Sequence, residues 1–413
     1  MKHVIIGASA AGITAAKTIR EIDVKAEIVM ISIDAWVHSR CMLHKYLSYE
    51  RGEMGISFVS EDFFDQYKIQ WKKETKVTRI DAVGQKAELE DESNVTYDRL
   101  LIATGAASVI PPVGEFRTAG NVFGLRNLSD AQQIRSMAEK AQRILIVGSG
   151  LVGMDAAYAF LENGKKVTVA EMADRILPLQ LDEKAGKAYQ RLFERAGCRF
   201  MLGKKATGTV SDASGNISKV ILDDNTEIEC DLVIVAAGVR PEVSCTEGSG
   251  IKADRFIEVD ETMQTNYPYV YAAGDVTGIS GIWPNAMKQG QAAAQNMCDI
   301  PTVYDDRYAM KNTMNFYGLL TLSLGRGVIE EGDKVLISED SKNYRRAILR
   351  NGKLDSILLQ GTIDYSGIYQ YLIKNEIDLE GKQEGIFNLS FKDFYGVKEN
   401  GEYQFQIENA AFT

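Results

Sequence analysis

The chain has 413 residues, of which 45% are hydrophobic and 25% are charged, and its formal net charge is −10. This length predicts two or three domains, and the composition is typical of a globular protein with full hydrophobic cores. The negative charge argues against nucleic acid and anionic membranes as main partners. The longest nearly apolar run, 232–239, is far shorter than the roughly 20 residues that span a bilayer. A strand is expected almost at Met1, with no room for a signal peptide before it, so we expect a cytoplasmic protein.

Cysteine and histidine, the residues that most often build metal and redox centres, are few: the chain has 5 cysteines and 3 histidines. No two cysteines form a Cys-x-x-Cys pair, and no histidine stands at zinc-finger spacing from a second His or Cys. We therefore expect no metal site, no local redox disulfide and no cysteine-bound iron–sulfur cluster. The chemistry is expected to come from bound organic cofactors.

A dinucleotide-binding fingerprint opens the chain. We expect a strand over 2–7, a helix over about 11–20 and a second strand over 26–32. Gly7 would allow the tight turn after the strand, and Gly12 would let the helix pack closely on it. The helix N-terminus then offers free N–H groups to a pyrophosphate. The residues between these glycines that are expected to line the phosphate site are Ser9, which takes the place of the middle glycine, Ala10 and Ala11.

The adenosine ribose of a nucleotide bound at such a fingerprint is usually held by an acidic residue about 20 positions past the last glycine. In this chain that position is Ser32, and Asp34 follows two residues later. Both residues are therefore candidates for the ribose contact.

A second fingerprint, with the full glycine spacing, follows the apolar run 144–147. The helix that it opens is expected to end at about 162. Two fingerprints in one chain indicate two bound nucleotides and a redox relay between them. The residues expected to contact the second nucleotide are Gly148, Gly150, Leu151, Val152 and Gly153.

The strand after this helix, 167–170, is followed by Glu171. A carboxylate at this place accepts hydrogen bonds from both ribose hydroxyls and repels a 2′-phosphate. The sequence therefore favours NADH over NADPH.

Three further apolar runs end in small residues: 100–105, 232–238 and 270–276. Such strand ends let the backbone approach a ligand in the crevice beyond a parallel sheet. Together with the alternating strands and helices, they predict an α/β fold with open sheets. The cofactor-binding candidates at these strand ends are Ala103, Thr104, Gly105, Gly238, Gly274 and Asp275.

Beyond about residue 309 the nucleotide-binding pattern ends. We expect short strands over 321–325, 344–349 and 353–360, with a hairpin turn at Asn-Gly 351–352, and then a helix over 365–374. This pattern predicts a small α+β C-terminal domain.

In this order, the motifs resemble those of the two-dinucleotide-binding-domain flavoproteins, the pyridine nucleotide-disulfide oxidoreductase superfamily that includes glutathione reductase. The resemblance covers about residues 1–300. It implies two Rossmann-like domains, with FAD on the first fingerprint and NADH on the second. It also implies that Asp275 binds the FAD ribityl chain and that the helix at Pro284 points its N-terminus at the flavin. The implied division is an FAD-binding domain (1–112 and 241–308), an NADH-binding domain (113–240) and a C-terminal interface domain (309–413).

The loop H-S-R-C-M-L-H-K-Y-L at 38–47 resembles the S-R-P-x-L-x-K loop of rubredoxin, putidaredoxin and nitrite reductase flavoproteins. This likeness makes Arg40 a candidate FAD contact. It implies that Lys45 lies beside flavin N5 and pairs with Asp155, where Asp replaces the usual Glu. A cation there stabilises the reduced flavin and helps hydride to arrive. The alternative is an interdomain salt bridge without a chemical role.

Cys41 bears on the choice of electron acceptor. Its C-x4-Y-L pattern also resembles the loop of NADH oxidases and coenzyme A disulfide reductases, in which a lone cysteine cycles beside the flavin. Lys45, His44 and the helix that follows could lower the pKa of the thiol. Alternatively, Cys41 is a small structural residue without redox chemistry.

The sequence thus predicts an NADH-dependent FAD oxidoreductase that passes electrons singly to a small iron–sulfur carrier, such as rubredoxin or a ferredoxin-like protein. Two alternatives stay open. One is reduction of a small disulfide or persulfide, or NADH oxidase activity, through Cys41. The other is an electron-transfer subunit of a larger redox complex. A homodimer is compatible with each of them.

Overall fold

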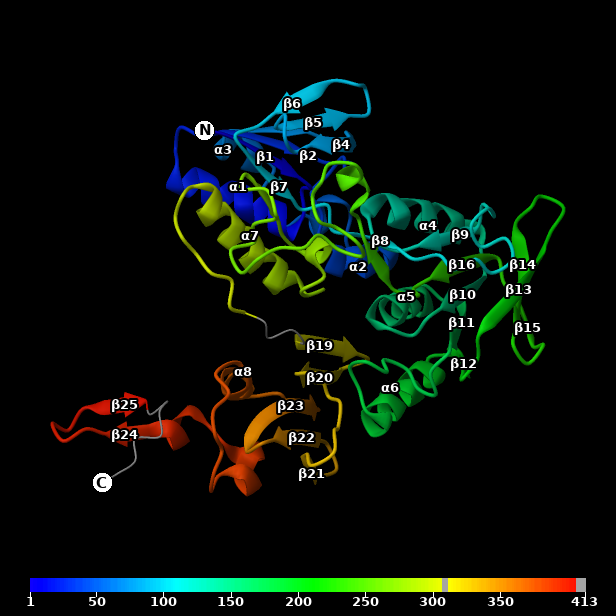
Figure 1. Cartoon of the computed structure of the whole chain (residues 1–413). Helices are drawn as coiled ribbons and strands as arrows, with labels where there is room; N and C mark the ends of the chain where they lie inside the picture. Colours follow the sequence, from blue (N-terminus) through cyan, green and yellow to red (C-terminus); the bar gives the residue numbers. More distant parts are fainter. Residues whose placement is uncertain (307–310, 406–413) are drawn as a thin grey trace. The chain divides into compact units, whose positions relative to one another are not determined.

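The computed structural model describes residues 1–306 and 311–405, which pack into two compact units (Figure 1). Unit 1 consists of Met1–Asp174 and Phe193–Arg307, and unit 2 of Arg175–Leu192 and Tyr308–Thr413. The expected boundary at 308–309 lies outside the described residues, so the division into three domains stays a prediction. None of the described helices is long and apolar enough to cross a membrane.

The first sheet of unit 1 has five parallel strands in the order β18-β7-β1-β2-β3. The chain reverses its direction of progress between β1 and β7, which is the switch point where open α/β sheets bind ligands. The middle of β1 is buried on both faces, because helices cover one face and a small sheet covers the other. The strands are β1 (Lys2–Ile6), β2 (Glu27–Ile31), β3 (Ile69–Lys72), β7 (Arg99–Ile102) and β18 (Val270–Ala272).

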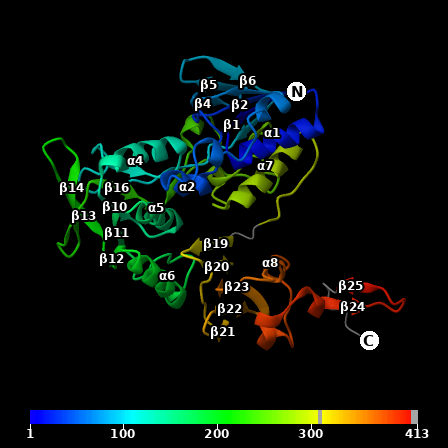
Figure 2. The ribbon, with the colours of Figure 1, turned by 180° about the vertical axis from the view of Figure 1, so that it is seen from behind.

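Two helices, α1 (Ala10–Ile22) and α7 (Trp283–Met297), lie side by side on one face of this sheet, as Figures 1 and 2 show. They approach closely because Gly290 of α7 lies against α1, where a Cβ would collide with the Ala11 carbonyl oxygen. Two short helices, α2 (Leu43–Leu47) and α3 (Phe63–Gln66), lie in the connection from β2 to β3. The antiparallel strands on the other face are β4 (Val77–Asp81), β5 (Lys86–Leu89) and β6 (Asn94–Thr96).

A second parallel sheet in unit 1 repeats this arrangement, in the order β12-β11-β10-β16-β9. Strand β10 takes the place of β1 and runs through a glycine turn into α5 (Leu151–Glu162), while α4 (Leu128–Lys140) precedes β10. The prediction of two Rossmann-like folds in one chain is therefore confirmed. The strands are β9 (Val122–Gly124), β10 (Arg143–Val147), β11 (Lys166–Glu171), β12 (Arg199–Leu202) and β16 (Leu232–Val235).

Smaller sheets complete unit 1. One is a two-stranded antiparallel pair formed by the segments that lead into and out of the second fold. The other is an antiparallel meander of three strands that packs against the second parallel sheet. The pair is β8 (Ala106–Ser108) with β17 (Val239–Pro241), and the meander is β13 (Ala206–Ser211), β14 (Ile217–Leu222) and β15 (Glu227–Glu229).

Unit 2 is an antiparallel sheet in the order β19-β20-β23-β22-β21, with α8 (Gly367–Lys374) packed on its core. The predicted hairpin turn at 351–352 connects β22 to β23, and the predicted helix begins at Gly367 rather than at 365. Helix α6 (Glu183–Arg195) starts in this unit, where the Tyr189 hydroxyl donates to the Leu319 carbonyl at 2.6 Å. The strands of this sheet are β19 (Lys311–Phe316), β20 (Leu319–Leu324), β21 (Lys334–Glu339), β22 (Tyr344–Arg350) and β23 (Lys353–Gln360). A separate antiparallel pair consists of β24 (Tyr395–Val397) and β25 (Tyr403–Phe405).

Candidate functional site

The first fingerprint forms a tight turn between β1 and α1. Gly7 has φ +113°, and a Cβ on it would collide with the carbonyl oxygen of Ala103 on the neighbouring strand. A Cβ on Gly12 would collide with the carbonyl oxygen of Gly7. Glycine is therefore required at both places, so that the N-terminus of α1 can reach the ends of the parallel strands.

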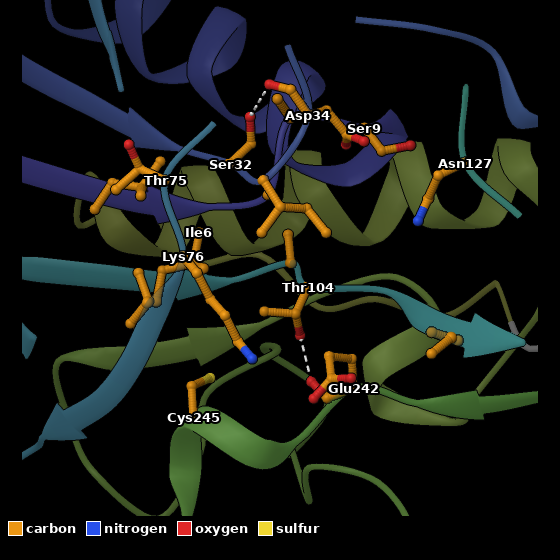
Figure 3. A pocket seen from close by; sticks show the side chains of 18 of the residues that line it. Ile6, Ser9, Ser32, Asp34, Thr75, Lys76, Thr104, Asn127, Glu242 and Cys245 are labelled. Atoms are coloured by element: carbon orange, nitrogen blue, oxygen red, sulfur yellow. Dashed lines mark hydrogen bonds between the residues drawn. The ribbon is translucent and has the colours of Figure 1, made fainter. Parts of the chain in front are cut away.

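A cavity of about 240 Å³ opens at this turn, at the carboxyl ends of the first sheet (Figure 3). Ser32 and Asp34, which follow β2, form one side of it, and Glu242 and Cys245 form another. The Ser32 hydroxyl donates to the backbone carbonyl of Asp34 at 3.2 Å and accepts from Trp71 Nε1 at 3.0 Å. Its two bonds hold the loop in place, which leaves the Asp34 carboxylate as the stronger candidate for a ribose contact.

A second cavity, of about 90 Å³, shares Ser9, Arg40 and Ala103 with the first in its walls. Two arginines meet there. Arg40 donates to the backbone carbonyl of Arg126 at 3.0 Å, and the Arg126 guanidinium forms an ion pair with Asp275. The further residues that line this cavity include Ala10, Ala11, Cys41, Gly105, Gly274 and Trp283.

The charges around these cavities fit an anionic ligand. Burial, and then the neighbouring Arg126, lower the pKa of Arg40, although the Asp34 carboxylate lies 3.8 Å away. An anion between the two guanidinium groups would relieve this repulsion, and the N-terminus of α1 supplies N–H donors to it. The pyrophosphate of a dinucleotide would fit this place, where Arg40, Arg126 and the N-terminus of α1 would hold it.

Arg126 is the charged residue of the second cavity that the sequence analysis missed. It lies just before α4, a helix of the second fold, yet its Nη2 reaches Asp275 beside the first sheet. None of the motifs in the chain contains it, and 149 positions separate the two residues. The requirement that a partly buried Asp275 have a polar partner was the one available signal, and it could not identify that partner.

The second fingerprint has the same geometry as the first. Gly148 has φ +105° and its Cβ would collide with the Ala236 carbonyl, while the space beside Gly150 is open. At the end of β11, Glu171 accepts hydrogen bonds from the backbone N–H of Ser149 at 2.7 Å and from that of Ala173 at 2.8 Å. The carboxylate is thus held at the position where a ribose is expected. Leu151, Val152 and Gly153 form the first turn of α5, and Gly238 follows β16 with open space around it.

The loop before α2 brings Cys41, Lys45 and Asp155 into one region of unit 1. The expected ion pair between Lys45 and Asp155 is wrong, because each has another partner. Lys45 Nζ lies 2.5 Å from Glu50, and Asp155 Oδ2 has His44 Nδ1 as its partner at 3.7 Å. Lys45 lies on a short helix that ends near Glu50, and an Asp side chain is one methylene shorter than the Glu that the resemblance implied. Both facts favour the local partner.

The Cys41 thiol opens onto the second cavity. Burial by the protein on its other sides raises the pKa of the thiol, and the Asp155 carboxylate raises it further. The expectation that Lys45 and His44 lower the pKa of Cys41 is therefore wrong. Glu50 engages Lys45, and burial lowers the pKa of His44 to about 4, so the imidazole is neutral near pH 7.

Two other side chains near the loop have structural contacts. His38 is buried; its Nδ1 donates to the Trp36 carbonyl at 3.0 Å, and its Nε2 accepts from the backbone N–H of Leu128 at 3.2 Å. At the start of α7, Pro284 occupies the first turn, as the fixed φ of proline favours. Within residues 1–306 and 311–405, no cluster of three His, Cys, Asp or Glu side chains could hold a metal ion.

Comparisons with known proteins identify the family of this chain. The family model of pyridine nucleotide-disulphide oxidoreductases matches residues 1–290. The epsilon subunit of NADH-dependent phenylglyoxylate dehydrogenase of Aromatoleum evansii is 32% identical over 392 residues, which cover 92% of this chain and 92% of that subunit. A rubredoxin-NAD(+) reductase of Pseudomonas putida is 26% identical over 361 residues, covering 84% of this chain and 92% of that reductase.

A solved structure shows the same fold. The ferredoxin reductase for the CYP199A2 system from Rhodopseudomonas palustris has a TM-score of 0.79 to this chain at 24% identity, covering 87% of this chain and 91% of the other. The chain belongs to the pyridine nucleotide-disulphide oxidoreductase family, and it is an oxidoreductase of the class that uses FAD and NAD(P)H.

Proposed function

We propose that this oxidoreductase passes electrons from NADH through FAD, one at a time, to a small iron–sulfur protein such as rubredoxin or a ferredoxin-like carrier. The state of Cys41 supports this proposal. Its pKa is raised, so the thiol stays protonated near pH 7, whereas a disulfide reductase needs a thiolate beside the flavin. Cys41 is also the one cysteine among the described residues that line its cavity. Electrons would then leave the flavin directly.

The chain's part in this reaction is binding and alignment. FAD, when bound, accepts hydride from NADH and releases electrons singly. The turn at Gly7 and the N-terminus of α1 hold its pyrophosphate, with Arg40 and Arg126 balancing the charge. The turn at Gly148 and the carboxylate of Glu171 hold the second nucleotide, and the ribose contact favours NADH. A cytoplasmic location is part of the same proposal.

The test compares wild type with Cys41→Ser in two assays: NADH-dependent reduction of rubredoxin or ferredoxin, and NADH-dependent reduction of small disulfides. We expect the variant to keep the carrier activity of wild type, and neither protein to reduce disulfides well. Cys298→Ser, which changes a half-buried cysteine outside the cavity, is the matched control. Disulfide turnover that disappears in Cys41→Ser would instead establish the thiol as a redox centre.

A second candidate is an electron-transfer subunit of a larger redox complex. One observation favours it: the similarity to the dehydrogenase epsilon subunit extends over 92% of both chains. A subunit would oxidise NADH slowly alone and quickly within an assembly purified from its native source. A free reductase would turn over with added carrier at the same rate in both preparations.

A further inference from the structure

Two titratable side chains from different folds of unit 1 meet near Cys41, which lines the second cavity. His44 belongs to α2, in the connection of the first sheet, and Asp155 belongs to α5 of the second fold. Their Nδ1 and Oδ2 atoms are 3.7 Å apart, and the side chains are 17% and 31% exposed. His44 Nδ1 is buried and has no hydrogen-bond partner. The reaction outlined above gives this pair no role.

The pair is one proton short of being neutral when its carboxylate is ionised. With a neutral imidazole and an ionised carboxylate it has one negative charge, and the imidazole keeps a single ring N–H, on Nδ1 or on Nε2. One added proton gives an N–H···O or O–H···N bond and removes the charge, which partial burial favours. Burial raises the pKa of Asp155 to about 7 against the effect of Lys45, while burial and Lys45 lower that of His44 to about 4. The two groups together thus bind one proton in the neutral range.

The charged groups around the pair do not neutralise it. From α2 and the turn after it, Lys45 is paired with Glu50, and Arg51 acts on His44. From α4, which also packs on α2, Arg135 lies over the Tyr46 and Tyr49 rings, 4.6 and 3.6 Å from their centroids.

The charge of the pair acts electrostatically on a residue that lines the second cavity. After burial, the Asp155 carboxylate is the largest contribution that raises the pKa of Cys41, whose thiol lines the second cavity. A negative charge placed on a ligand in that cavity would act back on Asp155 by the same route and favour its protonation.

We propose that the His44–Asp155 pair binds a proton when the cofactor in the second cavity is reduced. Two electrons enter the flavin, one proton binds its ring, and a second proton from water binds the pair, so that charge is balanced. The inference rests on the proposed function only in requiring that FAD binds here and can be reduced; the identity of the electron acceptor does not enter it.

The test is a potentiometric titration of the FAD in the purified holoprotein at a series of pH values, with mediators and without NADH or carrier. The slope of the midpoint potential against pH gives the protons bound per two electrons. Wild type should bind about one proton more than Asp155→Asn from about pH 7 upward, until the pKa of the reduced state is passed. Glu162→Gln, an exposed carboxylate at the end of α5, should behave like wild type. Equal proton counts in wild type and Asp155→Asn would overturn the proposal.

Infrared difference spectroscopy of the holoprotein at about pH 8 locates the proton and does not depend on activity. Reduction should produce the C=O band of a protonated carboxyl group in wild type. This band should be lost in Asp155→Asn and shifted in His44→Asn, which keeps a hydrogen-bonding side chain without the basic nitrogen. Absence of the band in wild type, or an unshifted band in His44→Asn, would contradict the proposal that the His44–Asp155 pair binds the proton. A failure of carrier reduction would leave both readouts intact, so it tests the proposed function alone.

Discussion

Glu171 is a single carboxylate whose position is set by its neighbours. Backbone N–H groups bind both of its oxygens, and the Ser149 hydroxyl also donates to it at 2.9 Å. We expect Glu171→Gln to lower the ratio of kcat/KM for NADH over NADPH about tenfold, because about 1.4 kcal/mol of repulsion toward a 2′-phosphate is lost. Steady-state kinetics with both nucleotides checks this, with Glu162→Gln as the control. An unchanged ratio would remove Glu171 from the nucleotide site.

Arg126 should matter for FAD more than its place in the sequence suggests. Arg126→Gln removes the cation that pairs with Asp275 and one of the two guanidinium groups at the second cavity. We expect FAD to bind about ten- to hundredfold more weakly, as for the loss of a hydrogen bond to a charged group, about 1.5–3 kcal/mol. Fluorescence titration of the apoprotein with FAD measures this. Arg117→Gln, which removes an exposed arginine bonded to the Ile110 carbonyl, should bind FAD like wild type.

His3 should make the protein sensitive to acid. It is fully buried in β1 with no hydrogen-bond partner at either ring nitrogen, and burial lowers its pKa from 6.5 to about 4. Between these pKa values the unfolded chain binds a proton at His3 that the folded chain does not bind. The free energy of unfolding is therefore undiminished above pH 6.5 and declines as the pH falls toward 4. The loss amounts to about 3 kcal/mol. Denaturant unfolding of wild type and His3→Leu between these pH values should give diverging curves; parallel curves would contradict the assignment.

At the scale of elements, the contact between α1 and α7 fixes the position of the α1 N-terminus, where we propose that the phosphates bind. Alanine in place of Gly290 would favour the helix by about 1 kcal/mol. Its Cβ would collide with the Ala11 backbone, however, and such overpacking costs about 1–3 kcal/mol. We expect Gly290→Ala to unfold at lower denaturant and to bind FAD more weakly, because α1 must shift. Gly52→Ala, where the space is open, is the control. A more stable Gly290→Ala protein would show that the helices adjust freely.

Most elements could be predicted because local patterns specify them. Strand β10 and helix α5 follow from an apolar run and correctly spaced glycines, and the β22–β23 hairpin follows from Asn-Gly. Helix boundaries were less accurate, since α1 extends to Ile22. The short α2 has no strong local signal, but it decides where His44 and Lys45 lie.

At the scale of the whole molecule, the proposed function predicts how many electrons the holoprotein takes up from NADH: one pair, held by the FAD. Anaerobic titration with NADH should bleach the flavin at one NADH per FAD, in wild type and in Cys41→Ser alike. The reason is that a Cys41 present as a thiol is already reduced and takes up no electrons, and with a raised pKa it does not donate charge to the flavin as a thiolate would. Visible spectra would show a contradiction directly: extra equivalents and a long-wavelength band in wild type that Cys41→Ser lacks.

The amino-acid sequence by itself determined the two nucleotide folds, the glycine turns and the position of Glu171, because each depends on residues close together in the chain. Tertiary structure alone decided the partners of the charged groups. Arg126 reaches Asp275 from another fold, and Asp155 meets His44 rather than Lys45. Electrostatic pairing depends on distance and burial, which arise only when separate elements pack together. The raised pKa of Cys41 has the same origin.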